Sequence, residues 1–498
     1  MVALLQENNV PETMRLGKNL LIYTVSDLLG KGMALLTSPF ITRLLTQEQY
    51  GSFGILSAIW SVVALFQFMG METSFQIFQA KDTEGHQREK LLTTATMIAT
   101  TSMFIIWGLF SLIALSGSWL INYAKVSTTE LAWYLLGLVP TILISWYLFI
   151  FRFMHKALSF ARTNLLSKAA SSVVLLLLLF LTSPNERLSM MFTGTFIIQG
   201  FIWGWALWEF KRSNLWPYHP THFSSDLARS MFKYGVVFIP GAVTYAAVMS
   251  MDRLIVGWLS GPAETSLIQL SISVGSVILM FKAWFMLIWD PNLVQWLSTR
   301  KPDVYLPKMQ LVLMGLAIVF FALACLSAIW IDLPIAILYP STYGPVARLL
   351  PVVVLTGACS TFSLVGISTI ILDPSPKYYF AVYICALIVT IAIGLITVPY
   401  LGALGAMLGT LGSELFILGS WIYRGKYLRK NINLNWRPVL IMGAISGVFS
   451  LLYQPGIIMT QQVFLERILM TLIISTPVVL MGYRVAHQIN LEDWLPIR

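Results

Sequence analysis

Eight ionisable residues stand inside otherwise apolar stretches of this chain, and they are the first indication of chemistry. A charge at the centre of a bilayer costs roughly 2.5–3.5 kcal/mol on insertion scales, so such residues face protein or water. Each is therefore a candidate functional residue of a membrane protein. Four are acids and four are bases: Asp27, Glu72, Asp252 and Glu414, and Lys31, Arg43, Arg253 and Lys282.

Four of the eight could neutralise each other locally. Asp27 and Lys31 are four residues apart, so on a helix they share one face and can form an ion pair. Asp252 and Arg253 are adjacent. For both pairs a structural ion pair and a functional site remain open alternatives.

The other four have no opposite charge one helical turn away. For Arg43 and Lys282 we favour a functional role, as cations that bind a substrate. A lone buried carboxylate tends to take up a proton, which makes Glu72 and Glu414 candidate proton-coupling groups. For these two acids we nevertheless favour a partner on another helix.

Signatures of covalent or ATP-driven chemistry are missing from the sequence. It contains no G-x-x-x-x-G-K-[ST], no G-x-S-x-G and no H-E-x-x-H. Cys325, Cys359 and Cys385 lack paired spacing, so neither a disulfide framework nor a metal site is expected. The five histidines all fall in predicted loops. We expect no enzyme activity and no cofactor.

The elements that must position these charges are membrane-spanning helices. Only 11% of the 498 residues are charged and the mean hydropathy is +0.76, whereas soluble domains carry roughly 25% charged residues. The segment Met1–Arg15 is too polar for a signal peptide, so we expect the chain to insert through its first span. An all-α membrane protein with about fourteen spans is predicted. The spans lie near residues 19–44, 52–80, 91–118, 131–151, 160–182, 188–210, 235–259, 265–289, 309–331, 347–372, 378–399, 401–423, 439–455 and 465–486.

The charges between these runs predict the topology. Lys and Arg number 24 on the side shared with the N-terminus and four on the other side, with four more inside spans. The first count places Arg162, Lys168 and Arg484 in the end turns of their spans. By the positive-inside rule, both termini should be cytoplasmic, in a bacterial inner membrane.

The chain also shows a division into halves. The longest connection follows span six, which predicts an N-terminal six-helix lobe (1–210), a cytoplasmic linker (211–234), a C-terminal six-helix lobe (235–423) and a basic loop with helices 13 and 14 (424–498). Arg43 and Arg253 both stand near the outer end of the first span of a half. Internal repeats of this kind are typical of secondary transporters.

Helix breakers and small residues add two expectations. Pro39, Pro140, Pro240 and Pro399 can kink their helices, and we predict a hinge at Pro240 and Gly241. Gly402, Gly405, Gly409 and Gly412 recur on one face of span twelve, which favours close helix packing.

Four segments carry a resemblance to a known family. They are Leu45–Gly51 (LTQEQYG), Tyr234–Pro240 (YGVVFIP), Ser250–Gly257 (SMDRLIVG) and Leu338–Gly344 (LYPSTYG). Together with length and span order, they resemble the Wzx-like polysaccharide flippases of the multidrug/oligosaccharidyl-lipid/polysaccharide exporter superfamily. Gln47 departs from the pattern, since proline is common there in the family.

The resemblance implies two six-helix lobes in a V around a cavity that opens to each side in turn. It implies that an undecaprenyl-diphosphate-linked oligosaccharide moves from the cytoplasmic to the periplasmic leaflet, for assembly of O-antigen or another surface polysaccharide. The cavity cations that would meet it are Lys31, Arg43, Arg253 and Lys282. Membrane lipids, a polysaccharide polymerase and a chain-length regulator are implied partners, and nucleic acid is not.

Other functions remain open. A cation-coupled drug exporter would use acids such as Asp27, Glu72 and Glu414. A peptidoglycan-precursor flippase should have an arginine-rich first span, which this chain lacks. A membrane glycosyltransferase or polymerase needs catalytic residues in sizeable loops. The longest predicted external loop, Ile331–Arg348, has only Asp332 and Arg348 as charged groups.

Overall fold

The computed structural model describes residues 12–81, 88–213, 215, 222–278, 282, 302–368, 376–428, 434–453 and 461–488. Over these residues the chain is helical and contains no strand. The first half comprises α2 (Glu12–Leu44), α3 (Gln47–Val63), η2 (Ala64–Phe66), α4 (Met71–Lys81), α5 (Arg88–Ser116), α6 (Trp119–Ala124), α7 (Thr128–Phe153), α8 (Ala157–Leu165), η3 (Leu166–Ala170), α9 (Ser171–Leu181), α10 (Arg187–Arg212) and α11 (Ser225–Val236). The second comprises α12 (Ile239–Leu259), α13 (Pro262–Ile278), α15 (Pro302–Trp330), α16 (Asp332–Leu338), η5 (Ser341–Tyr343), α17 (Val346–Ser368), α18 (Pro376–Leu401), α19 (Ala403–Leu428), α20 (Arg437–Leu452) and α21 (Gln461–Gln488).

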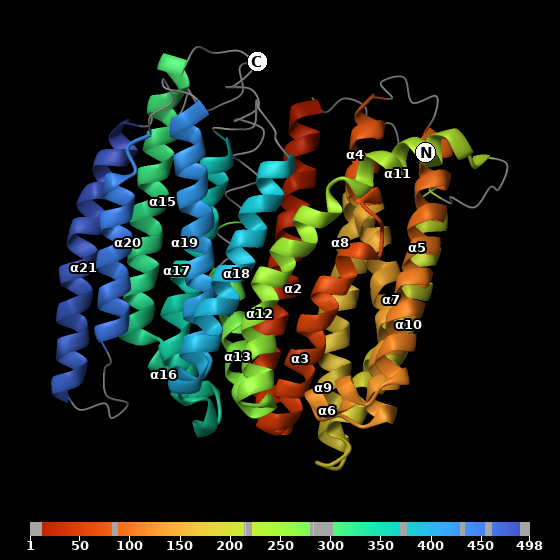
Figure 1. Ribbon diagram of the computed structural model, residues 1–498, viewed down its shortest axis with the longest axis horizontal. Helices are drawn as coiled ribbons and strands as arrows, with labels where there is room; N and C mark the ends of the chain where they lie inside the picture. Colours follow the sequence, from red (N-terminus) through yellow and green to blue (C-terminus); the bar gives the residue numbers. More distant parts are fainter. Residues whose placement is uncertain are drawn as a thin grey trace, which may run out of the picture. The chain divides into compact units, whose positions relative to one another are not determined.

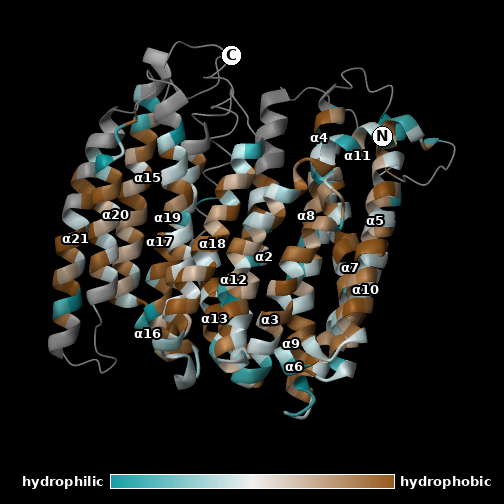
Figure 2. Ribbon diagram, in the orientation of Figure 1, coloured by the Kyte–Doolittle hydropathy of each residue, from teal (hydrophilic) through white to brown (hydrophobic). Residues whose placement is uncertain are grey.

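The helices confirm an all-α, multi-pass membrane protein. Ten helical stretches in the described residues are long and apolar enough to cross a bilayer. Each of the fourteen predicted runs falls on at least one helix. Figure 2 shows apolar residues along nearly the full length of the long helices. Helices suit this environment because they satisfy every backbone hydrogen bond internally.

The chain divides into two compact units, which we describe separately. Unit 1 comprises residues 1–45 and 60–243, and unit 2 comprises residues 46–59 and 244–498. The first part of α3 therefore packs with the second half of the sequence.

Unit 1 has an aromatic core. Trp146, Tyr147 and Phe151 of α7 are buried, and Phe210 of α10 lies 4.9 Å from Tyr147 between ring centroids. The Trp146 indole N–H donates to Thr96 Oγ1 of α5 at 3.3 Å. Aromatic side chains suit this core because offset and edge-to-face contacts hold the helices without polar groups.

Span two is not one long helix, which corrects the prediction of a continuous run over 52–80. The helix stops after η2, and Met69 and Gly70 adopt left-handed φ values of 47° and 72°. A Cβ atom on Gly70 would lie 2.3 Å from the Gly235 carbonyl oxygen near the end of α11. Ser74 Oγ donates to the Met231 carbonyl at 2.6 Å. The break thus lets α4 pack closely against α11, which crosses the bundle direction in Figure 1.

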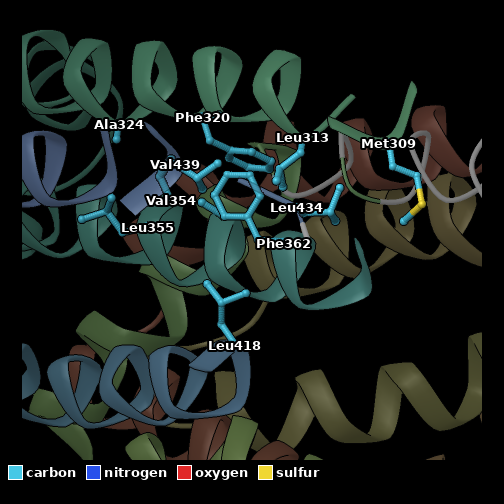
Figure 3. Close-up of a cluster of buried hydrophobic side chains, with 12 residues drawn as sticks. Met309, Leu313, Phe320, Ala324, Val354, Leu355, Phe362, Leu418, Leu434 and Val439 are labelled. Atoms are coloured by element: carbon cyan, nitrogen blue, oxygen red, sulfur yellow. The ribbon is translucent and has the colours of Figure 1, made fainter. Parts of the chain in front are cut away.

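Unit 2 has a mainly aliphatic core around α15. This helix contacts α17, α20 and α21. Figure 3 shows Phe320 and Phe362 meeting among leucine and valine side chains, with ring centroids 6.0 Å apart and an edge-on geometry. The predicted glycine face of span twelve is confirmed: a Cβ on Gly405 would lie 2.6 Å from the Thr397 carbonyl carbon of α18, and one on Gly409 2.9 Å from the Thr390 carbonyl oxygen. Only glycine permits this spacing.

Two of the four family-like segments meet in unit 2. Thr46 and Gln49 form a reciprocal cap at the start of α3, with Gln49 N–H donating to Thr46 Oγ1 and Thr46 N–H to Gln49 Oε1. The Gln47 amide donates to the Thr342 carbonyl at 3.0 Å, and Tyr50 lies edge-on to Tyr343. These contacts give Leu45–Gly51 and Leu338–Gly344 a shared structural role.

Candidate functional site

Unit 1 carries an exposed ion pair in its first helix. Asp27 Oδ2 and Lys31 Nζ are 3.2 Å apart, and their side chains are 50% and 39% exposed. The predicted pairing is therefore confirmed, but the pair is not enclosed by protein. Lys31 lies thirteen residues before the end of α2, about 20 Å along the axis. Hydrocarbon would penalise exposed charges at this distance from the helix end.

Arg43 lies at the C-terminal end of the same helix. Its side chain is exposed in the last turn of α2, where a cation is favoured by the helix dipole. Arg187 Nη1 of α10 donates to the Leu44 carbonyl at 2.6 Å and fixes this helix end. Arg43 is thus a cation on an anchored helix terminus.

Glu72 follows directly on the helix break of unit 1. It is exposed in the first turn of α4, where the helix dipole favours a carboxylate. The Gly70 turn therefore determines where this acid points.

Asp252 and Arg253 form an enclosed group in unit 2. Asp252 is 2% exposed, and its Oδ1 atom lies 3.7 Å from Arg253 Nε. Arg253 Nη1 donates to Gln269 Oε1 of α13 at 3.2 Å, and Nη2 donates to the Met249 carbonyl. The predicted pairing is confirmed, and both terminal nitrogens of Arg253 hydrogen-bond within its own unit.

Lys282 and Glu414 belong to a second enclosed group of unit 2. Lys282 Nζ donates to Ser360 Oγ of α17. The Tyr245 hydroxyl of α12 is 3.3 Å from Ser360 Oγ and donates to Glu414 Oε1 of α19 at 3.3 Å. Glu414 is 1% exposed. As expected for an acid without a local partner, Glu414 finds its hydrogen bond on another helix.

The predicted hinge residues stand at a helix boundary. α11 ends at Val236 and α12 begins at Ile239, so Pro240 and Gly241 occupy the first turn of α12. Proline suits this position because its missing N–H has no partner there in any helix. No Cβ contact would arise within 4 Å at Gly241. The hinge function itself stays a prediction.

Lys168 lies deeper in its helix than the sequence analysis predicted. We expected it in an end turn, but it is the twelfth residue of the 25-residue span Ala157–Leu181. Its side chain is exposed and belongs to η3, a π-helical turn between α8 and α9. The sequence analysis placed the start of this span near residue 160. The helical stretch starts at Ala157, three residues earlier.

The last two helices carry a buried ion pair and an apolar groove. Arg467 of α21 is fully buried and donates to both carboxylate oxygens of Asp332, at 2.9 and 2.6 Å. A cavity of about 610 Å³ lies along α20 and α21, lined by Ala444, Ile445, Val448, Phe449, Tyr453 and Met470. The ion pair attaches α21 to α16. The groove is lined by apolar side chains.

Comparison with known proteins identifies both family and fold. The family model described as "Polysaccharide biosynthesis protein" matches residues 16–286, more than half of the chain. The comparison with curated proteins gives no match. Among solved structures the chain is similar to the lipid II flippase MurJ in an inward closed conformation. The TM-score is 0.67 and the identity 14%, over 93% of this chain and 99% of that one.

Two MATE transporters show the same architecture. The Vibrio cholerae transporter VcmN matches with a TM-score of 0.55 and 15% identity, over 84% of this chain and 98% of that one. An inward-facing multidrug resistance MATE family transporter of the MOP superfamily matches with a TM-score of 0.55 and 13% identity, over 80% of this chain and 96% of that one. At these identities the likeness shows the fold alone.

Proposed function

The chain belongs to the polysaccharide biosynthesis protein family, and on this premise we propose that it is a flippase for an undecaprenyl-diphosphate-linked oligosaccharide. It turns the lipid from the cytoplasmic to the periplasmic leaflet of a bacterial inner membrane by alternating access. The product serves assembly of a surface polysaccharide such as O-antigen or capsule. Both termini are cytoplasmic in this proposal, as the loop charges predict.

The observation that carries this proposal is the exposed charge on α2. Asp27 and Lys31 are far from the outer helix end yet 50% and 39% exposed. Hydrocarbon would penalise both, so they support a water-filled path along α2. Such a path is what a sugar-diphosphate head group needs, because it cannot readily cross hydrocarbon.

The cations have the right sign for this substrate. Lys31 and Arg43 are both accessible on α2, and a guanidinium pairs with phosphate through a fork of donors. Lys282 and Arg253 hydrogen-bond within unit 2, so we assign substrate contact first to the α2 cations. The polyprenyl tail stays in hydrocarbon, and the α20–α21 groove provides an apolar surface for it.

Reconstitution tests the proposal directly. The full-length protein in liposomes should translocate a fluorescent polyprenyl-diphosphate sugar. Lys31→Ala and Arg43→Ala should fold but lose most of the translocation rate. Lys90→Ala, which removes an exposed lysine at the start of α5, is the control and should retain it.

Two outcomes would contradict the proposal. One is export of a cationic dye along a proton gradient without any lipid translocation, which would make the protein a drug exporter. The other is lipid translocation that is unchanged in both α2 variants, which would remove the α2 cations from the path.

A further inference from the structure

Helix α11 has two faces of different character. Met231 and Gly235 are buried, and the Met231 carbonyl accepts the hydrogen bond from Ser74 Oγ of α4. Arg229 and Lys233 are exposed, and because they are four residues apart they share one face of the helix. The helix is therefore amphipathic, with an apolar side turned to unit 1 and a cationic side turned outward.

The start of α11 lies at the end of a candidate membrane span, α5. The Ser224 N–H donates to Thr94 Oγ1 of α5 at 3.2 Å, and His222 Nδ1 lies 3.5 Å from Glu89 Oε2. Glu89 belongs to the first turn of α5, where residues 88–90 are all charged and exposed. Hydrocarbon would penalise three adjacent exposed charges, so this end of α5 belongs at a membrane surface. Figure 1 shows α11 crossing the bundle beside it.

We propose that the outward face of α11 binds the head groups of anionic phospholipids in the surrounding bilayer. This face, which we call the α11 surface, comprises Phe223, Arg229, Phe232 and Lys233. The inference goes beyond the proposed function, because its ligand is a bulk membrane lipid and not the transported one.

The cations of the α11 surface are available to a ligand. Neither Arg229 nor Lys233 has an ion-pair partner among the residues that the structure describes. The single acid of α11, Asp226, lies in the first turn, where the helix dipole stabilises a carboxylate. Two cations against one acid leave the helix with a net positive charge. Anionic head groups attract exposed lysine and arginine at a membrane surface.

Exposed aromatic side chains accompany these cations. Phe223, just before the helix, and Phe232 are each 42% exposed. Phe232 lies three residues after Arg229 and directly before Lys233, so its ring is beside both cations. Helices at membrane surfaces combine phenylalanine with lysine and arginine because the ring enters the acyl boundary while the cation stays with the phosphates. A bilayer at the end of α5 supplies both partners at once.

Packing inside unit 1 determines which face of α11 points outward. Tyr234 lies edge-on to Phe78 of α4, with ring centroids 6.4 Å apart. A Cβ atom on Gly235 would lie 2.7 Å from the Gly70 carbonyl oxygen. Rotation of α11 about its axis would bring a larger side chain into this contact. The α11 surface is therefore held outward by the tight approach of α4.

Binding of phosphatidylglycerol to the detergent-solubilised full-length protein tests the proposal, with native mass spectrometry as the measurement and zwitterionic phosphatidylcholine as the comparison lipid. The wild type should prefer phosphatidylglycerol. Arg229→Gln and Lys233→Gln should each weaken phosphatidylglycerol binding about fivefold, and the double variant about 25-fold, as each cation near an anionic lipid surface contributes. Asp226→Asn should strengthen it, because the α11 surface loses a repulsive charge.

Two further variants complete the test. Phe232→Ser should weaken the binding of both lipids, because the ring contacts the part that they share. The double variant Lys211→Gln with Lys377→Gln removes two exposed lysines outside the α11 surface. It is the control for loss of charge and should keep the wild-type affinity. Size-exclusion chromatography should show the same elution for every variant, since all the substituted side chains are exposed.

The two lipids separate a head-group site from a structural role. Unchanged phosphatidylglycerol affinity in the Arg229 and Lys233 double variant overturns the proposal, as does an equal loss for phosphatidylcholine. Equal affinity of the wild type for both lipids also overturns it and would leave the α11 surface to an acidic protein partner. A protein that binds phosphatidylglycerol through α11 but translocates no lipid-linked sugar would keep this surface and refute the proposed flippase function.

Discussion

The candidate site residues of the two units differ in how far their charged side chains are buried. In unit 2, Asp252 and Glu414 are 2% and 1% exposed, and each accepts hydrogen bonds from its own unit. In unit 1, Asp27, Lys31 and Lys168 are accessible, and Glu72 is exposed beside a helix break. Enclosed charges fix helices to one another, whereas exposed charges can bind a ligand.

The difference indicates how the tasks are divided. Buried ion pairs hold one geometry, because removing one partner leaves a charge without compensation. Accessible ion pairs contribute little to stability and can exchange partners at low cost. We therefore expect substitutions of the enclosed charges in unit 2 to act mainly on stability, and substitutions of the accessible charges in unit 1 to act mainly on binding and transport.

The largest expected effect is at the Arg467–Asp332 pair of unit 2. Arg467→Ala should lower stability by about 3–5 kcal/mol, because Asp332 then stays enclosed without its cation. Thermal unfolding followed by size-exclusion chromatography measures this loss. The double variant Arg467→Met with Asp332→Leu should recover most of it. If Arg467→Ala alone is as stable as wild type, the enclosed charges of unit 2 do not have the stabilising role that distinguishes them from those of unit 1.

Glu414→Ala should come next, at about 3 kcal/mol. The substitution removes the acceptor of the Tyr245 hydroxyl and leaves Lys282 enclosed without a nearby acid. Glu466→Ala removes an exposed acid of α21 and should have no measurable effect in the same unfolding assay. If Glu414→Ala instead abolishes transport at unchanged stability, unit 2 also takes part in coupling.

Gly70→Ala should destabilise unit 1 by about 1–3 kcal/mol. The residue has φ 72°, and a Cβ atom would meet the Gly235 carbonyl oxygen at 2.3 Å. Gly108→Ala in α5 is the matched control, because no neighbour lies within 4 Å and alanine favours the helix. Equal stability of the two variants would mean that the α4–α11 contact contributes nothing.

The smallest expected effect on stability is at the exposed pair of unit 1. Asp27→Asn should change the free energy of unfolding by less than about 1 kcal/mol, as is usual for solvent-exposed ion pairs. The same assay used for Arg467→Ala provides the scale. A loss as large as that of Arg467→Ala would show that both units use their charges for structure.

The sequence by itself determined what depends on local pattern. Apolar run length predicted the helices, and the i,i+4 spacing predicted the Asp27–Lys31 pair. Adjacency predicted the Asp252–Arg253 contact, and the glycine period predicted the close approach of α19 to α18. These features need only one helix or its immediate neighbour, so periodicity and spacing carry the information.

Only the tertiary structure decided which charges are enclosed and which remain accessible. Glu414 meets Tyr245 across 169 positions of sequence, and Gly70 turns where Gly235 leaves room for it. Lys168 is the twelfth residue of its helical stretch because that stretch starts at Ala157, and its side-chain stem packs on Gly30. Such contacts depend on which distant helices pack against each other. The apolar surfaces of these helices are too similar in sequence to indicate which helix will be the neighbour.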